Sequence, residues 1–150
     1  MWCRKGKRAW RAKLPRKSAD ALMAIQKTLK VGVVGLGTAS TQVLPFFGKL
    51  PHIVLGGGAD VRSEARAEFS KKYGAPAFES IEEIVRQDDI NAVWVATPNH
   101  LHAEHVVLAA NHGKHVICEK PMALSLDECD RMIAAADKNG VRLLQGHSKI

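Results

Sequence analysis

The chain has 150 residues, enough for one packed domain and too few for two of ordinary size. Hydrophobic residues make up 46% and charged residues 25%, a mixture typical of a soluble globular protein, which excludes a disordered or collagen-like chain. No apolar run approaches the roughly 20 residues that cross a bilayer, so we expect neither a transmembrane helix nor a membrane partner.

The net charge of +7 is concentrated at the amino end. Residues 1–30 hold ten Lys or Arg and one acid, Asp20, whereas residues 31–150 hold twelve against fourteen. Charge repulsion and the lack of apolar periodicity predict a disordered basic leader over residues 1–28. Such an arm could contact nucleic-acid phosphates or act as a targeting presequence, but it also fits an extension upstream of a start at Met23. We therefore expect no nucleic-acid partner.

The three cysteines, Cys3, Cys118 and Cys129, form no C-x-x-C pair, and their number is odd. This usage indicates a reducing compartment with free thiols, so we expect a cytoplasmic protein. We interpret Cys118 and Cys129 as small buried hydrophobic residues and assign no nucleophile among them.

From residue 29 onward, short apolar runs alternate with helical stretches. Strands that lack polar alternation and are each followed by a helix are buried on both faces, which is typical of a parallel sheet covered by helices. The predicted fold class is therefore α/β, a doubly wound parallel sheet. Strands are predicted at 31–34, 52–55, 92–96, 115–118 and 141–144, and helices at 38–49, 63–73, 81–87, 101–111 and 126–139.

Several helix boundaries have a local signal. Pro45 predicts a kink or break in the first helix, and Gly74 ends the second. Ser80 with Glu83, and Ser125 with Glu128, have the spacing of capping boxes. In the last helix we expect Met132, Ile133 and Ala136 to face inward before Gly140 ends it.

A glycine-rich turn directly follows the first predicted strand, with the sequence Gly35-Leu36-Gly37-Thr38-Ala39-Ser40. In the G-x-G-x-x-G fingerprint, the first Gly permits a tight turn and the second lets the backbone approach a pyrophosphate. Ser40 replaces the third Gly and is small enough to keep helix and strand close. Alone, the motif is equally consistent with a turn that holds no ligand.

Asp60 strengthens the interpretation, because it lies 25 residues after Gly35, just past the second strand, where an acid can bind an adenosine ribose. A 2′-phosphate beside Asp60 would meet like-charge repulsion of up to ~4 kcal/mol, which favours NAD over NADP. Arg62 complicates this preference, since its guanidinium could stack on adenine, pair with a phosphate or simply be solvated.

Two polar turns with proline follow later strands. Thr97-Pro98-Asn99 follows the strand at 92–96, and Glu119-Lys120-Pro121 follows the strand at 115–118. Both turns lie at the carboxyl edge of a parallel sheet, where open α/β folds bind ligands. Each could be an ordinary loop when taken singly.

Together these motifs resemble the amino-terminal half of the Gfo/Idh/MocA oxidoreductases, on Gly35-Leu36-Gly37, Asp60, the stretch 96–102 and Glu119-Lys120-Pro121. The resemblance covers roughly residues 29–150. It implies a Rossmann domain for NAD or NADP, with the family's carboxyl-terminal substrate domain and often an oligomer interface lying beyond this chain. It also implies that Lys120 lies between nicotinamide and substrate, Glu119 near the nicotinamide ribose, and Thr97, Asn99 and His102 along the cofactor.

The closing residues 146–150 are similar to family members that act on dihydroxylated aromatic acids. The ammonium of Lys120 can hydrogen-bond the substrate oxygen whose charge changes during hydride transfer, although a surface lysine after a strand is the plainer interpretation. His147 is the histidine we expect to face a substrate.

The histidines offer a rival prediction. His100, His102 and His105, with Glu104, resemble a metal-ligand cluster, but H-x-H and H-x-x-H spacings on a helix do not bring three side chains to one point. We expect no metal site.

The sequence therefore predicts residues 29–150 to be the NAD(P)-binding domain of an oxidoreductase acting on a hydroxylated small-molecule substrate: a sugar, a polyol or a dihydrodiol aromatic acid. We expect a homo-oligomer in the full-length form and little turnover from this stretch alone. A non-catalytic NAD-sensing module is the alternative.

Overall fold

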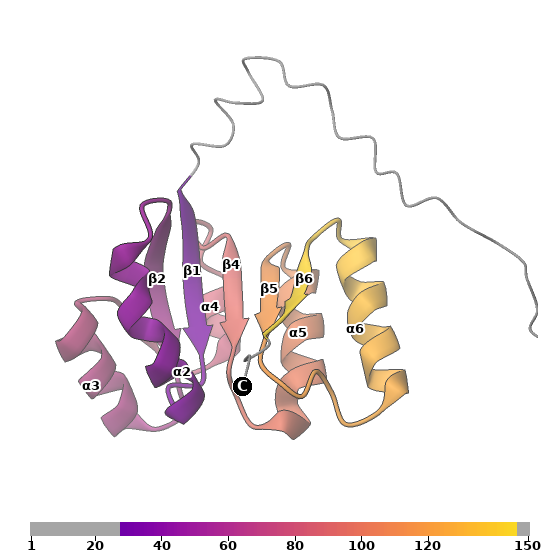
Figure 1. Cartoon of the computed structure of the whole chain (residues 1–150), viewed down its shortest axis with the longest axis horizontal. Helices are drawn as coiled ribbons and strands as arrows, with labels where there is room; N and C mark the ends of the chain where they lie inside the picture. Colours follow the sequence, from indigo (N-terminus) through magenta and orange to yellow (C-terminus); the bar gives the residue numbers. More distant parts are fainter. Residues whose placement is uncertain (1–27, 147–150) are drawn as a thin grey trace, which may run out of the picture.

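A computed structural model describes residues 28–146, and residues 1–27 of the predicted leader, with Cys3 and Met23, and His147 lie outside the described residues. Six parallel strands form one sheet in the order β3-β2-β1-β4-β5-β6, the order of a doubly wound fold (Figure 1). The fold class predicted from the sequence is confirmed. The strands are β1 Leu29–Val34, β2 Ile53–Ala59, β3 Ala77–Phe78, β4 Ala92–Val95, β5 His115–Cys118 and β6 Leu143–Gln145.

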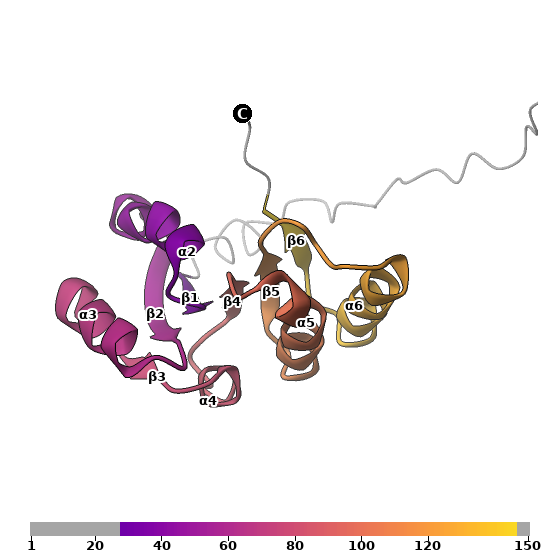
Figure 2. The ribbon, with the colours of Figure 1, turned by 90° about the horizontal axis from the view of Figure 1, so that it is seen from below.

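Helices lie on both faces of the sheet (Figure 2). Phe47 and Phe69 pack against Val31 and Val33 on one face, whereas Ile84, Val106 and Met132 pack against Val93 and Val95 on the other. The helical elements are α2 Thr38–Val43, the 3₁₀ helix η1 Leu44–Lys49, α3 Ser63–Tyr73, α4 Ile81–Val85, the 3₁₀ helix η2 Asn99–Leu101, α5 His102–Asn111 and α6 Leu126–Lys138. Among the described residues, no helix is long and apolar enough to cross a membrane.

Several predicted boundaries are confirmed. Helix α3 ends at Gly74, which is left-handed with φ +62°. The break predicted at Pro45 occurs one residue earlier, where α2 gives way to η1. The Ser125–Glu128 capping box is formed, since Ser125 Oγ accepts from Glu128 N at 3.2 Å and Glu128 Oε2 accepts from Leu124 N at 2.8 Å.

Three local predictions are wrong. The second strand continues through its three glycines to Ala59, because Gly57 and Gly58 still pair with β1. A Cβ at Gly58 would lie only 2.8 Å from Phe69 and 2.9 Å from Leu36, so glycine suits that position. Ser80 precedes α4 but caps no amide, and Glu83 Oε2 accepts instead from Glu79 N at 2.9 Å. In α6, Ile133 is 47% exposed, because it lies about 100° around the helix from buried Met132.

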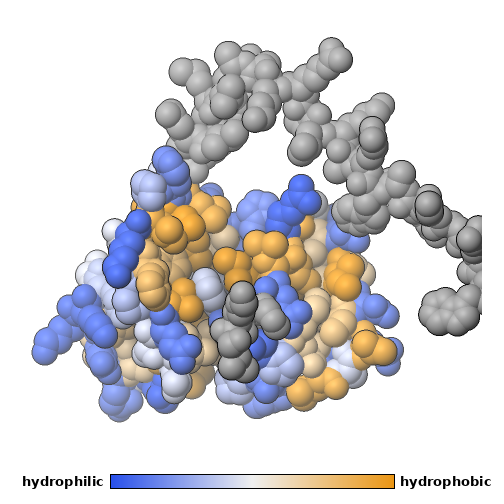
Figure 3. All heavy atoms as spheres, viewed as in Figure 1, coloured by the Kyte–Doolittle hydropathy of each residue, from blue (hydrophilic) through white to orange (hydrophobic). Residues whose placement is uncertain are grey.

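One face of the sheet is open over β4, β5 and β6. Trp94 pairs in register with Ile117, and Ile117 with Leu144, so the three side chains form a row on one face. No helix of residues 28–146 crosses this row in the end-on view of Figure 2. Trp94 and Ile117 are half-buried and Leu144 is 57% exposed, and hydrophobic residues reach the surface on the side shown in Figure 3.

Candidate cofactor-binding site

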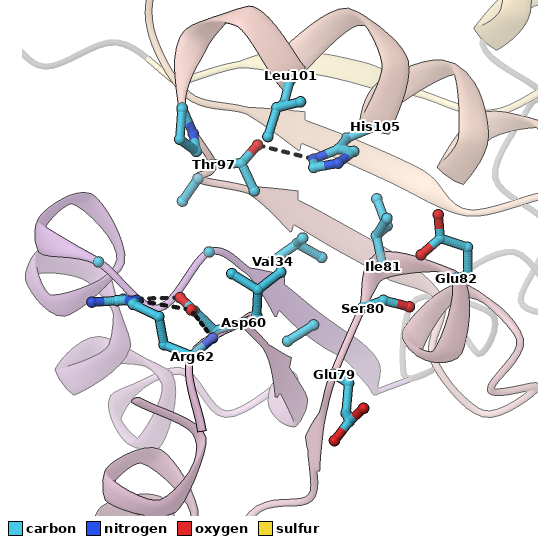
Figure 4. Close-up of a pocket in the computed structure, with 16 residues that line it drawn as sticks. Val34, Asp60, Arg62, Glu79, Ser80, Ile81, Glu82, Thr97, Leu101 and His105 are labelled. Atoms are coloured by element: carbon cyan, nitrogen blue, oxygen red, sulfur yellow. Dashed lines mark hydrogen bonds and ion pairs between the residues drawn. The ribbon is translucent and has the colours of Figure 1, made fainter. Parts of the chain in front are cut away.

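A cavity of about 510 Å³ opens where β1, β2, β3 and β4 end. All four strands run in the same direction, so the loops after their carboxyl ends meet at one edge of the sheet, the edge at which open α/β folds bind ligands. Figure 4 shows the side chains that line the cavity. Five of the twelve predicted site residues are among them: Gly35, Gly37, Asp60, Arg62 and Thr97.

The glycine turn forms one wall. Gly35 has φ +92°, and a Cβ on it would stand 2.5 Å from the carbonyl oxygen of Ala96, so only glycine fits there. Gly37 is different: its backbone is extended, and nothing lies within 4 Å of the position that its Cβ would take. The turn therefore keeps open space beside its second glycine, as a backbone that receives a phosphate group requires.

The other residues of this turn face away from the cavity. Ser40 is buried, and its hydroxyl donates to the Gly37 carbonyl at 2.8 Å. The hydroxyl, which Gly or Ala would not have at this position, therefore has a hydrogen-bond partner. Leu36 contributes its amide to Asp60 and points its side chain toward Gly58. Leu36, Thr38 and Ala39 do not line the cavity.

Asp60 is held by several donors. Its carboxylate accepts from the Leu36 amide at 2.8 Å, from the Arg62 amide at 2.9 Å and from two Arg62 guanidinium nitrogens at 3.0 Å each. Burial alone would raise the pKa of Asp60, but the Arg62 and Leu36 hydrogen bonds and the Arg62 charge together lower it below its usual value. The carboxylate is thus ionised and already paired.

Arg62 and Arg66 fix the loop after β2. The guanidinium of Arg62 is exposed at the cavity rim, where it also donates to the Leu36 carbonyl at 3.3 Å. Arg66 donates to the carbonyls of Asp60 and Val61 at 2.9 and 3.0 Å and reaches Glu79 at 2.9 Å. Through these contacts, Arg66 connects the end of β2 to the loop before α4 at the rim of the cavity.

The wall opposite the glycine turn was not foreseen from the sequence. It comes from the loop between β3 and α4 and from the first turns of η2 and α5. His105 is half-buried, and its Nδ1 lies 3.0 Å from Thr97 Oγ1. Burial lowers the pKa of His105, which the charges of Glu104 and Glu82 only partly oppose. The residues of these segments that line the cavity and were missed are Glu79, Ser80, Ile81, Glu82, Leu101 and His105.

His102 does not meet the cavity. The ring is fully buried, and its Nε2 lies 2.9 Å from the Thr97 carbonyl while its Nδ1 lies 2.8 Å from the Pro121 carbonyl. Both ring nitrogens are therefore engaged by main-chain oxygens, which leaves none for a cofactor. This histidine ties the turn after β4 to the turn after β5.

The turn after β5 lies outside the cavity lining. Trp94 Nε1 donates to Glu119 Oε1 at 3.2 Å from the open face of the sheet, and the Lys120 amide contacts the same carboxylate at 3.3 Å. Lys120 is exposed and joined to Pro121 by a cis peptide, and Asn99 is also exposed. Neither side chain is engaged in a hydrogen bond among the described residues.

The remaining reactive groups stay apart. Burial, with a smaller contribution from the Glu119 charge, raises the pKa of the Cys118 thiol to about 12, so this residue is a poor nucleophile at neutral pH. Within residues 28–146, no three His, Cys, Asp or Glu side chains come together as metal ligands. His100 is exposed whereas His102 is buried.

Known proteins share this architecture. A 1-carboxy-3-chloro-3,4-dihydroxycyclohexa-1,5-diene dehydrogenase from Comamonas testosteroni is 38% identical over 121 residues, which cover 80% of this chain and 30% of the relative. A scyllo-inositol 2-dehydrogenase (NADP(+)) from Bacillus subtilis (strain 168) is 49% identical over 86 residues, which cover 56% of this chain and 26% of the relative. The crystal structure of the WlbA dehydrogenase from Bordetella pertussis, in complex with NADH and UDP-GlcNAcA, superposes with a TM-score of 0.77 at 30% sequence identity. The match covers 80% of this chain and 35% of the WlbA chain.

The chain spans about a third or less of the length of each of these relatives. The sequence profile of the Gfo/Idh/MocA proteins, described as an oxidoreductase family with an NAD-binding Rossmann fold, matches residues 29–147. The glycine turn, the paired Asp60 and the cavity at the carboxyl edge of the sheet fit that description. This chain belongs to the Gfo/Idh/MocA oxidoreductase family and carries its NAD(P)-binding Rossmann domain.

Proposed function

We propose that residues 29–150 bind NAD(P) for an oxidoreductase that transfers a hydride between the nicotinamide and a hydroxylated small molecule. The observation that carries the proposal is the open space beside Gly37 at the mouth of the cavity. When bound, the cofactor supplies the hydride chemistry itself, and the protein positions it. Gly35 and Gly37 would hold the diphosphate, and the Asp60–Arg62 pair would meet the adenosine ribose.

The choice between NAD and NADP depends on Arg62 in this proposal. The preference for NAD that the sequence suggested treats Asp60 as a free carboxylate, but its charge is neutralised by the guanidinium of Arg62. The family includes a relative named for NADP(+) and a structure with NADH. We therefore propose that both cofactors enter and that Arg62 pairs with the 2′-phosphate of NADP.

The test is calorimetric titration of the 150-residue chain with NAD and with NADP. Arg62→Ala should weaken NADP binding by about tenfold, since one charge-assisted contact is lost, and change NAD binding by less than about threefold. Arg131, an exposed residue of α6, provides the control, and Arg131→Ala should change neither affinity. An equal loss of both cofactors in Arg62→Ala would contradict this role.

For the substrate side, we propose that Lys120 donates to the substrate oxygen whose charge changes during hydride transfer, with Glu119 near the nicotinamide ribose. The exposure of Lys120 at the carboxyl edge of the sheet supports this, as does the fixed Glu119 carboxylate beside it. Thr97 and Asn99 would lie along the cofactor. His102 would act as a positioning residue, because its ring has no free nitrogen.

The substrate class rests on the relatives. One is named for a dihydroxycyclohexadiene and another for scyllo-inositol, and both substrates carry secondary hydroxyl groups on a six-membered ring. We propose a cyclic polyol or dihydrodiol for this protein, with the substrate pocket supplied by polypeptide outside residues 29–150 and by a homo-oligomeric assembly. The relatives are named dehydrogenases, and nothing in the site favours a non-catalytic sensor.

A further inference from the structure

Trp94 is a large aromatic residue near the carboxyl end of β4, and the proposed function gives it no role. Its side chain is half-buried and packs against the cluster of buried residues that contains Val33 and Phe47. The indole nitrogen nevertheless reaches a residue far along the chain, because Nε1 donates to Glu119 Oε1 at 3.2 Å. This hydrogen bond joins the core of the sheet to the Glu119–Lys120 turn.

The strand register explains why this contact forms. Strands β4 and β5 lie side by side in Figure 1, and Trp94 pairs with Ile117, two residues before Glu119. The Glu119 amide continues the ladder by donating to the Val95 carbonyl at 2.9 Å. Because side chains alternate between the two faces of a strand, Glu119 emerges on the same face as Trp94. Diagonal neighbours on one face are bridged by long or aromatic side chains, so a short residue at position 94 would not reach the carboxylate.

Two uncharged donors hold the Glu119 carboxylate. The indole of Trp94 donates to Oε1, and the amide of Lys120 donates to Oε2 at 3.3 Å. Glu119 takes no part in the ion pairs formed within residues 28–146. A carboxylate has about four acceptor positions, so two donors leave it with further capacity to accept hydrogen bonds. The group is therefore fixed in place but still able to bind hydroxyl groups of a ligand.

Main-chain atoms confine the same carboxylate on another side. The Gly146 amide donates to the Cys118 carbonyl, and a Cβ at Gly146 would lie 3.4 Å from both Cδ and Oε1 of Glu119. A glutamate side chain without such neighbours samples several rotamers and loses that freedom when it binds a ligand. Ordering a side chain of this kind weakens binding several-fold. The indole hydrogen bond removes this cost before the ligand arrives.

We propose that Trp94 is a positioning residue for the nicotinamide half of the cofactor, because its indole N–H holds the Glu119 carboxylate ready to accept from hydroxyl groups of the nicotinamide ribose. The inference rests on the proposed function, which puts Glu119 near that ribose. Trp94 acts only through Glu119. Its loss should therefore affect ligands that carry the second ribose and spare those that lack it.

The test compares NAD with ADP, which lacks the nicotinamide ribose, in calorimetric titrations of the 150-residue chain. Trp94→Phe keeps an aromatic ring and removes the donor, so it should weaken NAD binding by about fivefold and change ADP binding by less than about twofold. Glu119→Ala should also weaken NAD binding. In the Glu119→Ala background, Trp94→Phe should change NAD affinity by less than about twofold, because the carboxylate that it orients is absent.

A second measurement does not depend on the stability of Trp94→Phe. The indole N–H resonance of Trp94, assigned by its absence from the NMR spectrum of Trp94→Phe or of Trp94→Tyr, should shift in Glu119→Ala. In the unmodified chain it should shift on saturation with NAD and stay in place on saturation with ADP. Leu144→Ala is the matched control, since it shortens an exposed side chain of the same open face, and it should change neither affinity.

Three results would overturn the positioning role while leaving NAD(P) binding intact. They are NAD affinity unchanged in folded Trp94→Phe, equal weakening of NAD and ADP in that variant, and an indole resonance that does not respond to Glu119→Ala. Failure of the folded, unmodified chain to bind either NAD or ADP would instead overturn the proposed function and this role with it.

Discussion

Gly35 and Gly37 stand two residues apart, and their surroundings differ. Gly35 has a positive φ and a carbonyl oxygen 2.5 Å from where a Cβ would be, whereas Gly37 is extended and has open space around it. The fold requires glycine at position 35, whereas the space beside Gly37 is the one that we propose for the ligand. A pair of alanine variants separates them.

Gly35→Ala should lower the free energy of unfolding by more than about 2 kcal/mol, because the left-handed conformation and the backbone clash both penalise a side chain. Gly37→Ala should change it by less than about 1 kcal/mol, with stabilisation expected from the stiffer unfolded chain. It should nevertheless weaken NAD(P) binding by about tenfold or more, because the new methyl group occupies the space for the phosphate. Urea denaturation measures the effect on stability, and calorimetric titration measures the effect on binding. A larger loss of unfolding free energy in Gly37→Ala than in Gly35→Ala would contradict the different roles given to the two glycines.

The Asp60 carboxylate gives the protein an acid-sensitive contact. Its pKa is lowered in the fold, so the unfolded chain binds a proton at a higher pH than the folded chain does. The contribution of Asp60 to stability is therefore present above its ordinary pKa of 3.8 and is lost as the pH falls through the lower folded value.

We expect the unmodified chain to be more stable than Asp60→Asn at pH 7, with the difference shrinking as the pH is lowered below about 4. Thermal unfolding of both proteins between pH 7 and pH 2.5 measures this difference. A difference that stays constant over the whole range would show that the Asp60 charge has no part in it.

At the scale of single elements, the two predicted capping boxes had different outcomes. Ser125 caps α6 through the Glu128 amide, whereas Ser80 leaves the amides of α4 uncapped. The spacing of the residues was the same in both cases. What differs is that Ser80 lies at the wall of the cavity and that Glu83 accepts from the Glu79 amide.

Ser125→Ala should lower the free energy of unfolding by about 1 kcal/mol, the usual cost of losing an N-cap. Ser80→Ala is the matched control and should cost less than half as much, because no amide loses its partner. Chemical denaturation of both variants at neutral pH provides the comparison. Equal costs would mean that the Ser125 hydroxyl contributes nothing as a cap.

The elements also show which parts of the site a sequence can reveal. The glycine turn and Asp60 follow strands with clear apolar patterns, so their meeting at one sheet edge could be predicted. The wall with Ser80 and His105 depends on β3, a strand of two residues whose pairing with β2 has no sequence periodicity. Tertiary packing determines where this wall lies, and short local sequence patterns do not predict such packing.

The roles of two buried polar residues, Lys114 and His102, were also not predicted from the sequence. Lys114 is 7% exposed, and its ammonium donates to the carbonyls of Gln87 at 2.7 Å and Ile90 at 2.9 Å, which holds the loop before β4. His102 similarly joins two turns through main-chain oxygens. In the sequence both resemble surface or ligand residues, because their partners are backbone atoms that no residue pattern identifies.

For the whole molecule, the fold places its two predicted chemical regions at the same sheet edge but in different surroundings. The cavity lies over the ends of β1, β2, β3 and β4, whereas Glu119 and Lys120 follow β5, next to the open row of Trp94, Ile117 and Leu144. Residues 28–146 thus contain a formed cavity, which we propose for the dinucleotide. They leave the region around Lys120 exposed.

Binding of a dinucleotide to this cavity should also stabilise the entire fold, because the residues that line the cavity come from loops after four different strands. At a free concentration 100 times the dissociation constant, the expected gain in unfolding free energy is about 2.7 kcal/mol. Thermal unfolding with increasing NAD or NADP should show a rising midpoint. A midpoint unaffected by either cofactor at millimolar concentration would argue against binding to the folded state.

The most direct test of the central claim is the calorimetric titration of the 150-residue chain with NAD and NADP, performed on protein shown by circular dichroism to be folded. We predict saturable binding of at least one of the two at one molecule per chain, weakened about tenfold or more by Gly37→Ala. A folded chain that releases no binding heat with either dinucleotide, or a Gly37→Ala variant that binds as tightly as the unmodified protein, would contradict the assignment of the cavity to NAD(P).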